Sequence, residues 1–316
     1  MIIDTDTASD DAVAIIMALR WHDVDVKALT IVNGNVNARQ AAVNALYTTE
    51  LCGSDVPVYL GAEKPLMRPT AHAEWFHGRD GLGDMNYPAP KRSLSPGHAA
   101  DALVETIKAN PGIILVTLGP LTNVAMAVSK APEIAGMVSR CIVMGGAACT
   151  VGNVTPAAEY NIWCDPEAAR IVFHSGLPVE MVGWELCRGQ ANILPEEMTH
   201  IRSFGTPLAE FAMDCNRRAY EATLAQSGDP GLGLPDPVAM AVALDPSICT
   251  RTSKHYVEVE THSELTRGQT VVDEFGVSTD ERNAGLWAEA HAAGAITICW
   301  QIDIPRWKEA LYTVLR

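Results

Sequence analysis

The sequence predicts an α/β fold in which helices cover both faces of a doubly wound, mostly parallel sheet. Short apolar runs alternate with segments whose apolar residues recur at helical spacing. Strands buried on both faces appear as continuous apolar runs, and their alternation with helices is typical of parallel sheets. The chain has 316 residues, of which 48% are hydrophobic, so a large core can form. We expect one domain over residues 1–316, because α/β folds often reach this length undivided.

The expected elements follow in strand–helix order. The first strand, residues 1–3, ends at Asp4, and Ser9 is the expected N-cap of the helix that follows. The other expected strands are residues 26–32, 56–60, 112–118, 138–144, 178–182, 256–260, 270–272 and 295–298. The other expected helices are residues 38–51, 98–108, 121–129, 166–174, 238–244 and 304–315. A mainly helical segment is expected at about 195–235, with a break near 205–207, and a long loop at 61–96.

Charge and composition exclude several classes of partner. The formal net charge of −15 argues against nucleic acid or an anionic membrane, since no concentrated basic patch is visible. No apolar run reaches the ~18 residues of a membrane span, and Asp4 interrupts the only apolar run at the N-terminus. The eight cysteines are scattered without a C-x-x-C pair, so neither a zinc site nor a compact disulfide framework is expected. We therefore predict a cytoplasmic protein with reduced thiols.

Four aspartates crowd the loop after the first strand: Asp4, Asp6, Asp10 and Asp11. Crowded carboxylates repel one another, and burial increases the cost. A hard divalent cation resolves this conflict, and Ca²⁺ tolerates the irregular oxygen coordination that a loop supplies. Two acids in the first turn of a helix are common without any metal, because the helix dipole favours them. Four beside the carboxyl end of an apolar strand, where ligands bind in such sheets, favour a metal site.

The acidic loop by itself also permits a phosphatase. An aspartate pair spaced as Asp4 and Asp6 after a strand is similar to the haloacid-dehalogenase-type phosphatases, in which the first aspartate is the nucleophile and Mg²⁺ binds nearby. That pattern requires Thr or Val where this chain has Ala8. Its later lysine and acidic pair have no convincing match in this chain.

The segment 3–15 resembles the opening of the inosine–uridine-type nucleoside hydrolases, which carry a D-x-D-x-x-x-D-D motif there. Further segments similar to that family follow in the same order, at residues 33–35, 77–83, 118–123, 152–161, 165–169 and 236–239. Each segment is a weak signal by itself. Their joint order over residues 1 to about 244 is specific, whereas the last seventy or so residues carry no motif.

The resemblance implies calcium-dependent hydrolysis of the N-glycosidic bond of ribonucleosides, which gives ribose and a free base. Asp6 matches the general base that takes a proton from a calcium-bound water, and Asp10 also grips the sugar hydroxyls. The implied calcium ligands are Asp6, Asp10, Asp11, Asp236 and the backbone carbonyl of Leu118. The implied substrate-binding residues are Asn35, His77, Asn153, Glu159 and Asn161. Family members commonly form homodimers or homotetramers, so we expect a homo-oligomer.

Each of these residues also has a plainer interpretation by itself. Asn153 and Asn161 are common turn formers, and Glu159 could be a solvated loop acid. His77 could be a surface histidine, and Asp236 followed by proline makes an ordinary helix start. Only the matched order of the segments favours the functional interpretation.

Two departures from the family pattern bear on the chemistry. Thr7-Ala8 replaces the usual Pro-Gly inside the acidic motif, which leaves the acidic positions intact. Pro235 stands where many relatives have a histidine that activates the departing base, and proline has no donor. The sequence therefore leaves the base preference open. A non-catalytic nucleoside- or ribose-binding protein stays an alternative, and Tyr220 or Arg217, or stacking on Trp75, Trp163 or Trp184, could replace the histidine.

Overall fold

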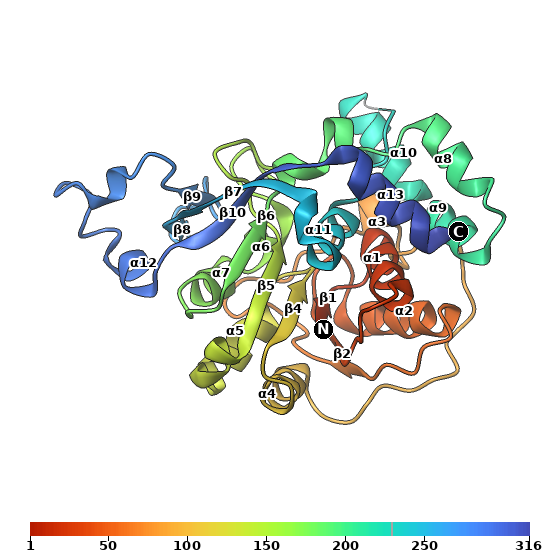
Figure 1. Cartoon of the computed structure of the whole chain (residues 1–316), viewed down its shortest axis with the longest axis horizontal. Coiled ribbons are helices and arrows are strands. Elements are labelled where there is room, and N and C mark those ends of the chain that lie inside the picture. The colour runs from red at the N-terminus through yellow and green to blue at the C-terminus, as the bar shows by residue number, and fades with distance from the viewer. Residues whose placement is uncertain (229) are drawn as a thin grey trace.

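An eight-stranded sheet forms the centre of the computed structural model, which describes residues 1–228 and 230–316 (Figure 1). Its strand order is β3-β2-β1-β4-β5-β6-β10-β7. All neighbouring strands are parallel except β10 and β7, which are antiparallel. The strands are β1 (Ile2–Thr5), β2 (Ala28–Ile31), β3 (Val58–Leu60), β4 (Ile113–Thr117), β5 (Val138–Met144), β6 (Val179–Val182), β7 (Cys249–His255) and β10 (Ile296–Ile302). The order reverses next to β1, so this mostly parallel sheet is doubly wound, as predicted.

Residues of the central strands enter two separate cores, one on each face of the sheet. In β1, Ile3 joins one hydrophobic cluster and Ile2 the other. The cluster around Ile3 is covered by α1 (Ser9–Arg20), α2 (Ala38–Leu51), α9 (Pro207–Cys215), α11 (Pro235–Leu244) and α13 (Ile304–Leu315). The cluster around Ile2 is covered by α4 (Ala99–Ala109), α5 (Thr122–Lys130) and α7 (Pro166–Phe173). Both faces are therefore buried, which explains the continuous apolar runs of the central strands.

The predicted helical segment consists of three helices. They are α8 (Pro195–Arg202), α9 and α10 (Arg217–Ser227), and the break predicted near 205–207 separates α8 from α9. A second break falls at Asn216, and residue 229 of the predicted segment lies outside the described residues. Helix α9 packs on α1, and α10 packs on the short helix α3 (Glu74–His77).

A smaller unit projects from the far end of the sheet, in the blue part of Figure 1. It contains the antiparallel pair β8 (Val257–Val259) and β9 (Thr270–Val272) and the short helix α12 (Ala288–Ala293). The two predicted strands in this region exist, but they pair with each other and do not belong to the central sheet.

One strand and three short α-helices were missed by the predictions, and one helix cap differs. The edge strand β7 was not predicted, because its sequence is polar and all seven of its positions are at least partly exposed on the sheet edge. The short helices α3, α6 (Tyr160–Cys164) and α12 were also missed, since each is too short for a helical period. Ser9 is not the N-cap of α1. Ala8 occupies that position and donates its N–H to the Asp11 carboxylate at 2.9 Å, while the Ser9 hydroxyl pairs with His77.

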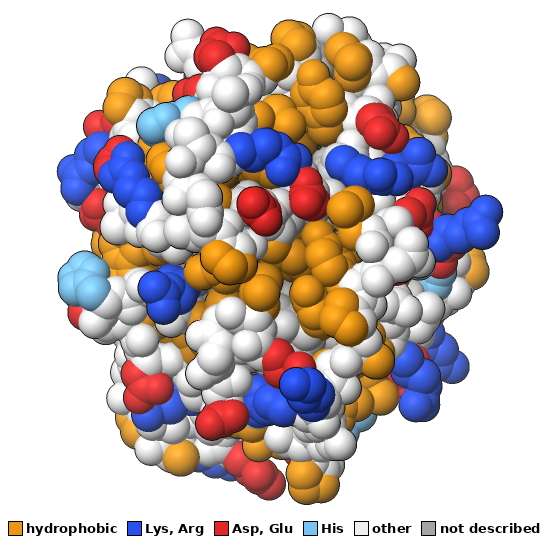
Figure 2. All heavy atoms as spheres, turned by 90° about the vertical axis from the view of Figure 1, so that its right-hand side faces the viewer, with side chains coloured by type: hydrophobic (Ala, Val, Ile, Leu, Met, Phe, Trp, Pro, Cys, Tyr) orange, Lys and Arg blue, Asp and Glu red, His pale blue; other side chains and the backbone are white. Residues whose placement is uncertain are grey.

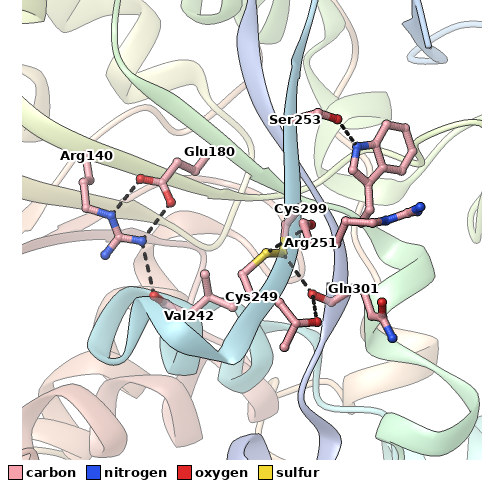
Figure 3. The surroundings of a disulfide bond; sticks show 10 residues. Arg140, Glu180, Val242, Cys249, Arg251, Ser253, Cys299 and Gln301 are labelled. Atoms are coloured by element: carbon pink, nitrogen blue, oxygen red, sulfur yellow. Dashed lines mark hydrogen bonds and ion pairs between the residues drawn. A yellow bond between two sulfur atoms is a disulfide. The ribbon is translucent and has the colours of Figure 1, made fainter. Parts of the chain in front are cut away.

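One disulfide corrects the expectation that all the cysteines are reduced. Cys249 of β7 and Cys299 of β10 are bonded across adjacent strands, with their Cα atoms 6.2 Å apart (Figure 3). The pairing follows from the antiparallel contact of β7 with β10, so it could not be foreseen while β7 was unrecognised. The other six cysteines are free, and Cys149 is the exposed one.

Charges of both signs are interspersed on the face of the molecule drawn in Figure 2. Lysine and arginine side chains there lie beside aspartate and glutamate, and no continuous basic surface forms on this face. Within the described residues, none of the helices has both the length and the apolar character that crossing a membrane requires.

Candidate active site

The candidate site lies at the carboxyl ends of the central strands, where the acidic loop leaves β1. Asp10 and Asp11 lie in the first turn of α1, and Asp236 lies in the first turn of α11. Helices α1 and α11 pack against each other, so residues more than 220 positions apart in the chain meet. Both helix N-termini carry partial positive charge, which favours carboxylates at this point.

Three of the predicted ligands form a compact carboxylate cluster. One oxygen each of Asp10, Asp11 and Asp236 lies within 4.8 Å of the others, and all three residues are buried. In the described part of the chain, no group hydrogen-bonds to Asp10 Oδ1 or to Asp6 Oδ1, although both atoms are buried. Buried carboxylate oxygens without a donor are costly unless a cation satisfies them. This donor set fits a hard cation that prefers oxygen, such as Ca²⁺.

Burial and mutual repulsion raise the pKa values of these carboxyls. Loss of solvation raises the pKa of Asp10 to about 6, and the same cause, with repulsion from Asp10, raises the pKa of Asp11 to about 6. Burial first, and then neighbouring carboxylates, hold the pKa values of Asp6 and Asp236 well above the usual range. The protein alone therefore disfavours four negative charges here, and bound positive charge would reverse that preference.

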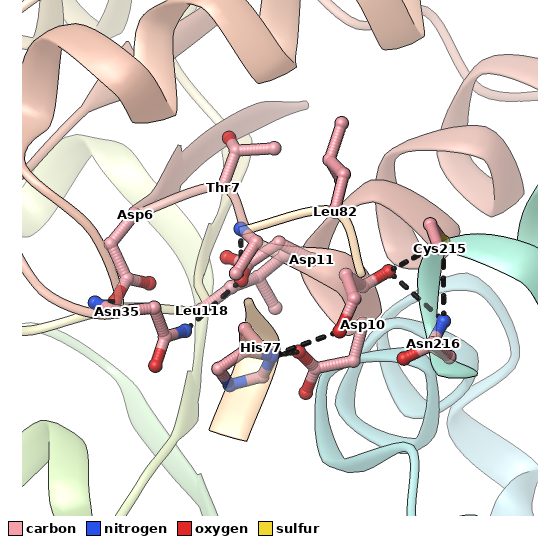
Figure 4. Close-up of polar contacts among 12 residues, drawn as sticks. Asp6, Thr7, Asp10, Asp11, Asn35, His77, Leu82, Leu118, Cys215 and Asn216 are labelled. Carbon is pink, nitrogen blue, oxygen red and sulfur yellow. Dashed lines mark hydrogen bonds and ion pairs between the residues drawn. The ribbon is translucent and has the colours of Figure 1, made fainter. Parts of the chain in front are cut away.

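Asp6 lies between two glycines that have no room for a side chain. A Cβ atom on Gly34 would lie 2.0 Å from Asp6 Oδ2, and one on Gly119 would lie 2.5 Å from Asp6 Oδ1. Asp6 Oδ2 accepts the Asn35 N–H at 2.6 Å (Figure 4). The Asn35 side chain points toward Asp11, with Nδ2 3.4 Å from Asp11 Oδ2. The loop after β2 thus shapes the position of Asp6.

Leu118 and Asn161 are adjacent. Asn161 Nδ2 donates to the Leu118 carbonyl at 2.8 Å and to the Met144 carbonyl at 3.2 Å. These carbonyls lie at the ends of β4 and β5, so Asn161 joins two strand ends beside the cluster. A ligand contact of Asn161 would use its Oδ1, because its nitrogen is already engaged.

Glu159 and Asn153 both organise the start of α6. Glu159 is the N-cap, and its carboxylate accepts backbone N–H groups from Gly146, Asn161 and Ile162. Burial raises the pKa of Glu159 to about 7. Asn153 Oδ1 accepts the Tyr160 N–H at 2.9 Å. Both of these predicted substrate-binding residues therefore have a local structural function. The sequence suggested a turn function for Asn153 but not the helix cap at Glu159.

His77 is a buried histidine beside the cluster. Its Nδ1 lies 2.8 Å from Ser9 Oγ and 3.8 Å from Asp10 Oδ1 (Figure 4). Burial lowers the pKa of His77 to about 4. The imidazole is therefore neutral near pH 7, and its position in α3 brings the long loop 61–96 to the acidic helix.

Sequence reasoning counted Asp4 among the crowded aspartates but did not foresee its partners, and it assigned no function to Asn123 or Asn216. Asp4 is fully buried, and its Oδ2 accepts hydrogen bonds from Thr30 and Asn123. Asn216 Nδ2 donates to the Ser9 carbonyl at 3.2 Å, which ties the α9–α10 junction to the start of α1. Asn123 belongs to a segment that resembles the family, but only the fold shows what it holds. Asn216 carries no sequence signal.

Pro235 occupies the position at which many relatives have the histidine that activates the departing base. Pro235 begins α11, and its carbonyl faces the Cys187 thiol at 3.9 Å. Arg217, one candidate for the missing function, donates Nε to the Gly83 carbonyl and so holds the long loop. Trp163 lies under the Arg267 guanidinium, and Trp75 is 67% exposed beside Phe76.

Comparison with known proteins identifies the family. The model of a protein family described as "inosine-uridine preferring nucleoside hydrolase" matches residues 1–308. The pyrimidine-specific ribonucleoside hydrolase RihA of Salmonella paratyphi B is 36% identical over 302 residues, which cover 94% of this chain and 96% of RihA. A solved plant nucleoside hydrolase has a TM-score of 0.91 at 32% identity and covers 99% of this chain and 98% of its own. A solved inosine-guanosine nucleoside hydrolase has a TM-score of 0.89 at 31% identity, with the same coverage.

These matches, with a fold that brings buried carboxylates to the strand ends, define an N-ribosyl hydrolase. The chain belongs to the inosine–uridine preferring nucleoside hydrolase family, and its reaction class is hydrolysis of the N-glycosidic bond of ribonucleosides. The family assignment leaves the phosphatase interpretation of the acidic loop without support.

Proposed function

We propose that this chain is a calcium-dependent ribonucleoside hydrolase in which Asp6 is the general base. The observation that carries the proposal is the convergence of Asp10, Asp11 and Asp236 within 4.8 Å, beside buried oxygens of Asp6 and Asp10 that find no donor among the described residues. The Leu118 carbonyl would complete the ligand set, with Asp6 at its edge. Bound Ca²⁺ would orient the nucleophilic water and lower its pKa.

The chain's own residues supply base catalysis and binding. Asp6 Oδ1 has no donor within the described residues and would accept the proton of the attacking water. Burial and the neighbouring carboxylates raise the pKa of Asp6, and bound Ca²⁺ would offset this effect, so that Asp6 would be ionised and able to act as a base near neutral pH. Attack of this water on C1′ would form the new C–O bond as the glycosidic C–N bond breaks. The proton of the water would pass to Asp6, and the departing base would leave with the bonding electron pair and take a proton from solvent.

Positive charge develops on the ribose ring as the glycosidic bond breaks. The surrounding carboxylates, Asp6, Asp10 and Asp11, would stabilise this charge electrostatically. Asn35, Asn153, Glu159 and Asn161 would hold the ribose hydroxyls, and fixed hydroxyls keep C1′ in line with the water. Asp10 would also bind these hydroxyls, and the neutral side chain of His77 would face the 5′ side of the ribose or the base.

We assign this chain no preference between purine and pyrimidine nucleosides. The name of RihA specifies pyrimidines, whereas the inosine-guanosine enzyme is named for purine nucleosides. Both are similar to this chain, so similarity does not choose between them. Pro235 also leaves the departing base without a donor at that position.

The test is base release from a panel of purine and pyrimidine ribonucleosides, with and without EDTA, for wild type and Asp6→Asn. We expect release that EDTA abolishes, that added Ca²⁺ restores, and that falls by about 10²–10⁴-fold in Asp6→Asn. Saturable ribose or nucleoside binding with no base release in any sample would instead show the non-catalytic binding protein. Release that is insensitive to EDTA would contradict the calcium dependence.

A further inference from the structure

One peptide group stands between Asp6 and two side chains that the proposed chemistry does not use. Its N–H end is that of Asn35, which donates to Asp6 Oδ2 at 2.6 Å. Its C=O end is that of Gly34, which accepts from two donors. The Tyr160 hydroxyl lies 3.1 Å from the Gly34 oxygen, and His72 Nδ1 lies 2.9 Å from it. Because the other atom is a carbonyl oxygen, His72 must carry its proton on Nδ1.

The peptide bond connects these contacts electronically. Resonance couples the carbonyl and the N–H of one peptide unit. Donors that polarise the carbonyl therefore strengthen the N–H as a donor, and such chains of hydrogen bonds reinforce one another. One continuous chain of hydrogen bonds results. It runs from Tyr160 and His72 to the Gly34 carbonyl, through the peptide bond, and from the Asn35 N–H to the carboxylate of the proposed base, Asp6.

The peptide is also fixed mechanically. The Asn35 carbonyl accepts the Ala73 N–H at 2.8 Å, so the next peptide is tied to the long loop as well. Tyr160 is held in turn, because its N–H donates to Asn153 Oδ1 and it begins α6 directly after the Glu159 cap. Its hydroxyl also lies 3.1 Å from the Ala71 carbonyl, so its single proton is shared between the Gly34 and Ala71 oxygens and links the loop after β2 to the long loop.

We propose that Tyr160 and His72 are positioning residues that orient Asp6 through the Gly34–Asn35 peptide. They pin Asp6 Oδ2 to the Asn35 N–H and so leave Oδ1 for the reacting water. This inference rests on the proposed function, in which Asp6 is the base. The inference gives the long loop, through His72, an influence on a carboxylate to which that loop makes no direct hydrogen bond among the described residues.

The kinetic test uses Tyr160→Phe, which removes the hydroxyl and keeps the ring, and His72→Ala. We expect each variant to lower kcat about fivefold, the effect of one ordinary hydrogen bond, with KM within about twofold of wild type. His72→Asn should restore most of the rate, because its amide nitrogen can donate where Nδ1 does. Tyr312→Phe, which removes a distant hydroxyl bonded to Glu197, is the matched control and should leave kcat unchanged.

A second readout does not depend on activity. The amide ¹⁵N–¹H signal of Asn35, observed in asparagine-labelled protein, reports hydrogen bonding to the Gly34 carbonyl. We expect this signal to shift in Tyr160→Phe and His72→Ala but not in Tyr312→Phe, while thermal unfolding and Ca²⁺ affinity stay near those of wild type.

The outcomes separate the two proposals. An Asn35 signal that is unchanged in both variants, or a raised KM with unchanged kcat, overturns the positioning inference even if the enzyme is active. If wild type releases no base from any nucleoside, the proposed function fails, and the Asn35 signal still decides whether this chain of hydrogen bonds exists.

Discussion

Two glycines determine how closely the protein can surround the side chain of Asp6. Gly34 and Gly119 approach Asp6 from the ends of β2 and β4, and a methyl group at either position would overlap its carboxylate. The geometry of the site therefore depends on the absence of a Cβ atom at these two glycines as much as on the charged groups. A proposed general base held this tightly can be tested by adding a single carbon atom.

Gly34→Ala should reduce nucleoside hydrolysis by about 10²-fold or more, because displacement of a reacting group by about 1 Å has an effect of that size. The new Cβ would lie 2.0 Å from Asp6 Oδ2, so the carboxylate must move. Steady-state kinetics and circular dichroism measure activity and fold together. Gly136→Ala is the matched control, since nothing lies within 4 Å of its Cβ position, and it should behave as wild type. Full activity in Gly34→Ala would mean that Asp6 does not need its present position.

Asp236→Asn should weaken Ca²⁺ binding by at least about 10–100-fold, the loss typical when even an outer-sphere partner of a metal is removed. The reason is that Asp236 supplies one of the three carboxylates that converge from separate elements. Isothermal titration calorimetry of EDTA-stripped protein measures the affinity. Asp23→Asn, at an exposed aspartate, should bind as wild type does. Equal affinities for all three proteins would remove Asp236 from the ligand set.

At the scale of elements, the disulfide between β7 and β10 closes a loop that contains the projecting unit. The bonded cysteines are 50 residues apart in sequence, and β8, β9 and α12 lie between them. In the described part of the chain, strand β7 pairs with β10 alone and forms the antiparallel edge of the sheet. A covalent link there would restrain both the edge strand and the unit that leaves it.

Replacing both bonded cysteines by serine should lower the free energy of unfolding by up to about 4 kcal/mol, from the loop entropy of a closure of this length. Urea unfolding of the double variant against wild type measures the difference. Cys149→Ser, at an exposed free cysteine, is the control and should unfold as wild type does. Thiol titration of the denatured, unreduced wild type should find six thiols; eight would contradict the disulfide.

The central strands were predictable because burial on both faces makes them continuous apolar runs, as in β1, β4 and β5. β7 was not, because an edge strand with polar, exposed residues has no such signature. The aspartates of the site could be found by their crowding and by resemblance to the family. The residues that position them, such as Asn123, Asn216 and Tyr160, could not, because an asparagine or tyrosine that bonds to a distant backbone carbonyl leaves no local pattern.

At the scale of the whole molecule, the carboxylate cluster joins the first helix of the chain to α11. Asp10 and Asp11 arrive with the N-terminal strand, whereas Asp236 arrives after the helical segment α8–α10. A cation held by all three would link distant parts of the sequence. A ligand that binds only the folded chain raises its stability by mass action.

EDTA should therefore lower the melting temperature of the protein by several degrees. At a Ca²⁺ concentration about 100 times Kd, binding adds about 2.7 kcal/mol, which its removal withdraws. Differential scanning calorimetry with and without EDTA measures the shift. Asp236→Asn should show a clearly smaller shift, because at 10–100-fold weaker affinity the same Ca²⁺ concentration adds only about 0.4–1.4 kcal/mol. If the melting temperature of the wild type is the same with and without EDTA, no bound cation links α1 to α11.

The most direct test of the account follows ribose release while Ca²⁺ is added to EDTA-stripped protein. The concentration that gives half-maximal rate should equal the dissociation constant measured by calorimetry on the same sample. Rate and binding should then rise together from zero. A stripped protein that releases ribose at the full rate before any Ca²⁺ is added would contradict a calcium-dependent nucleoside hydrolase.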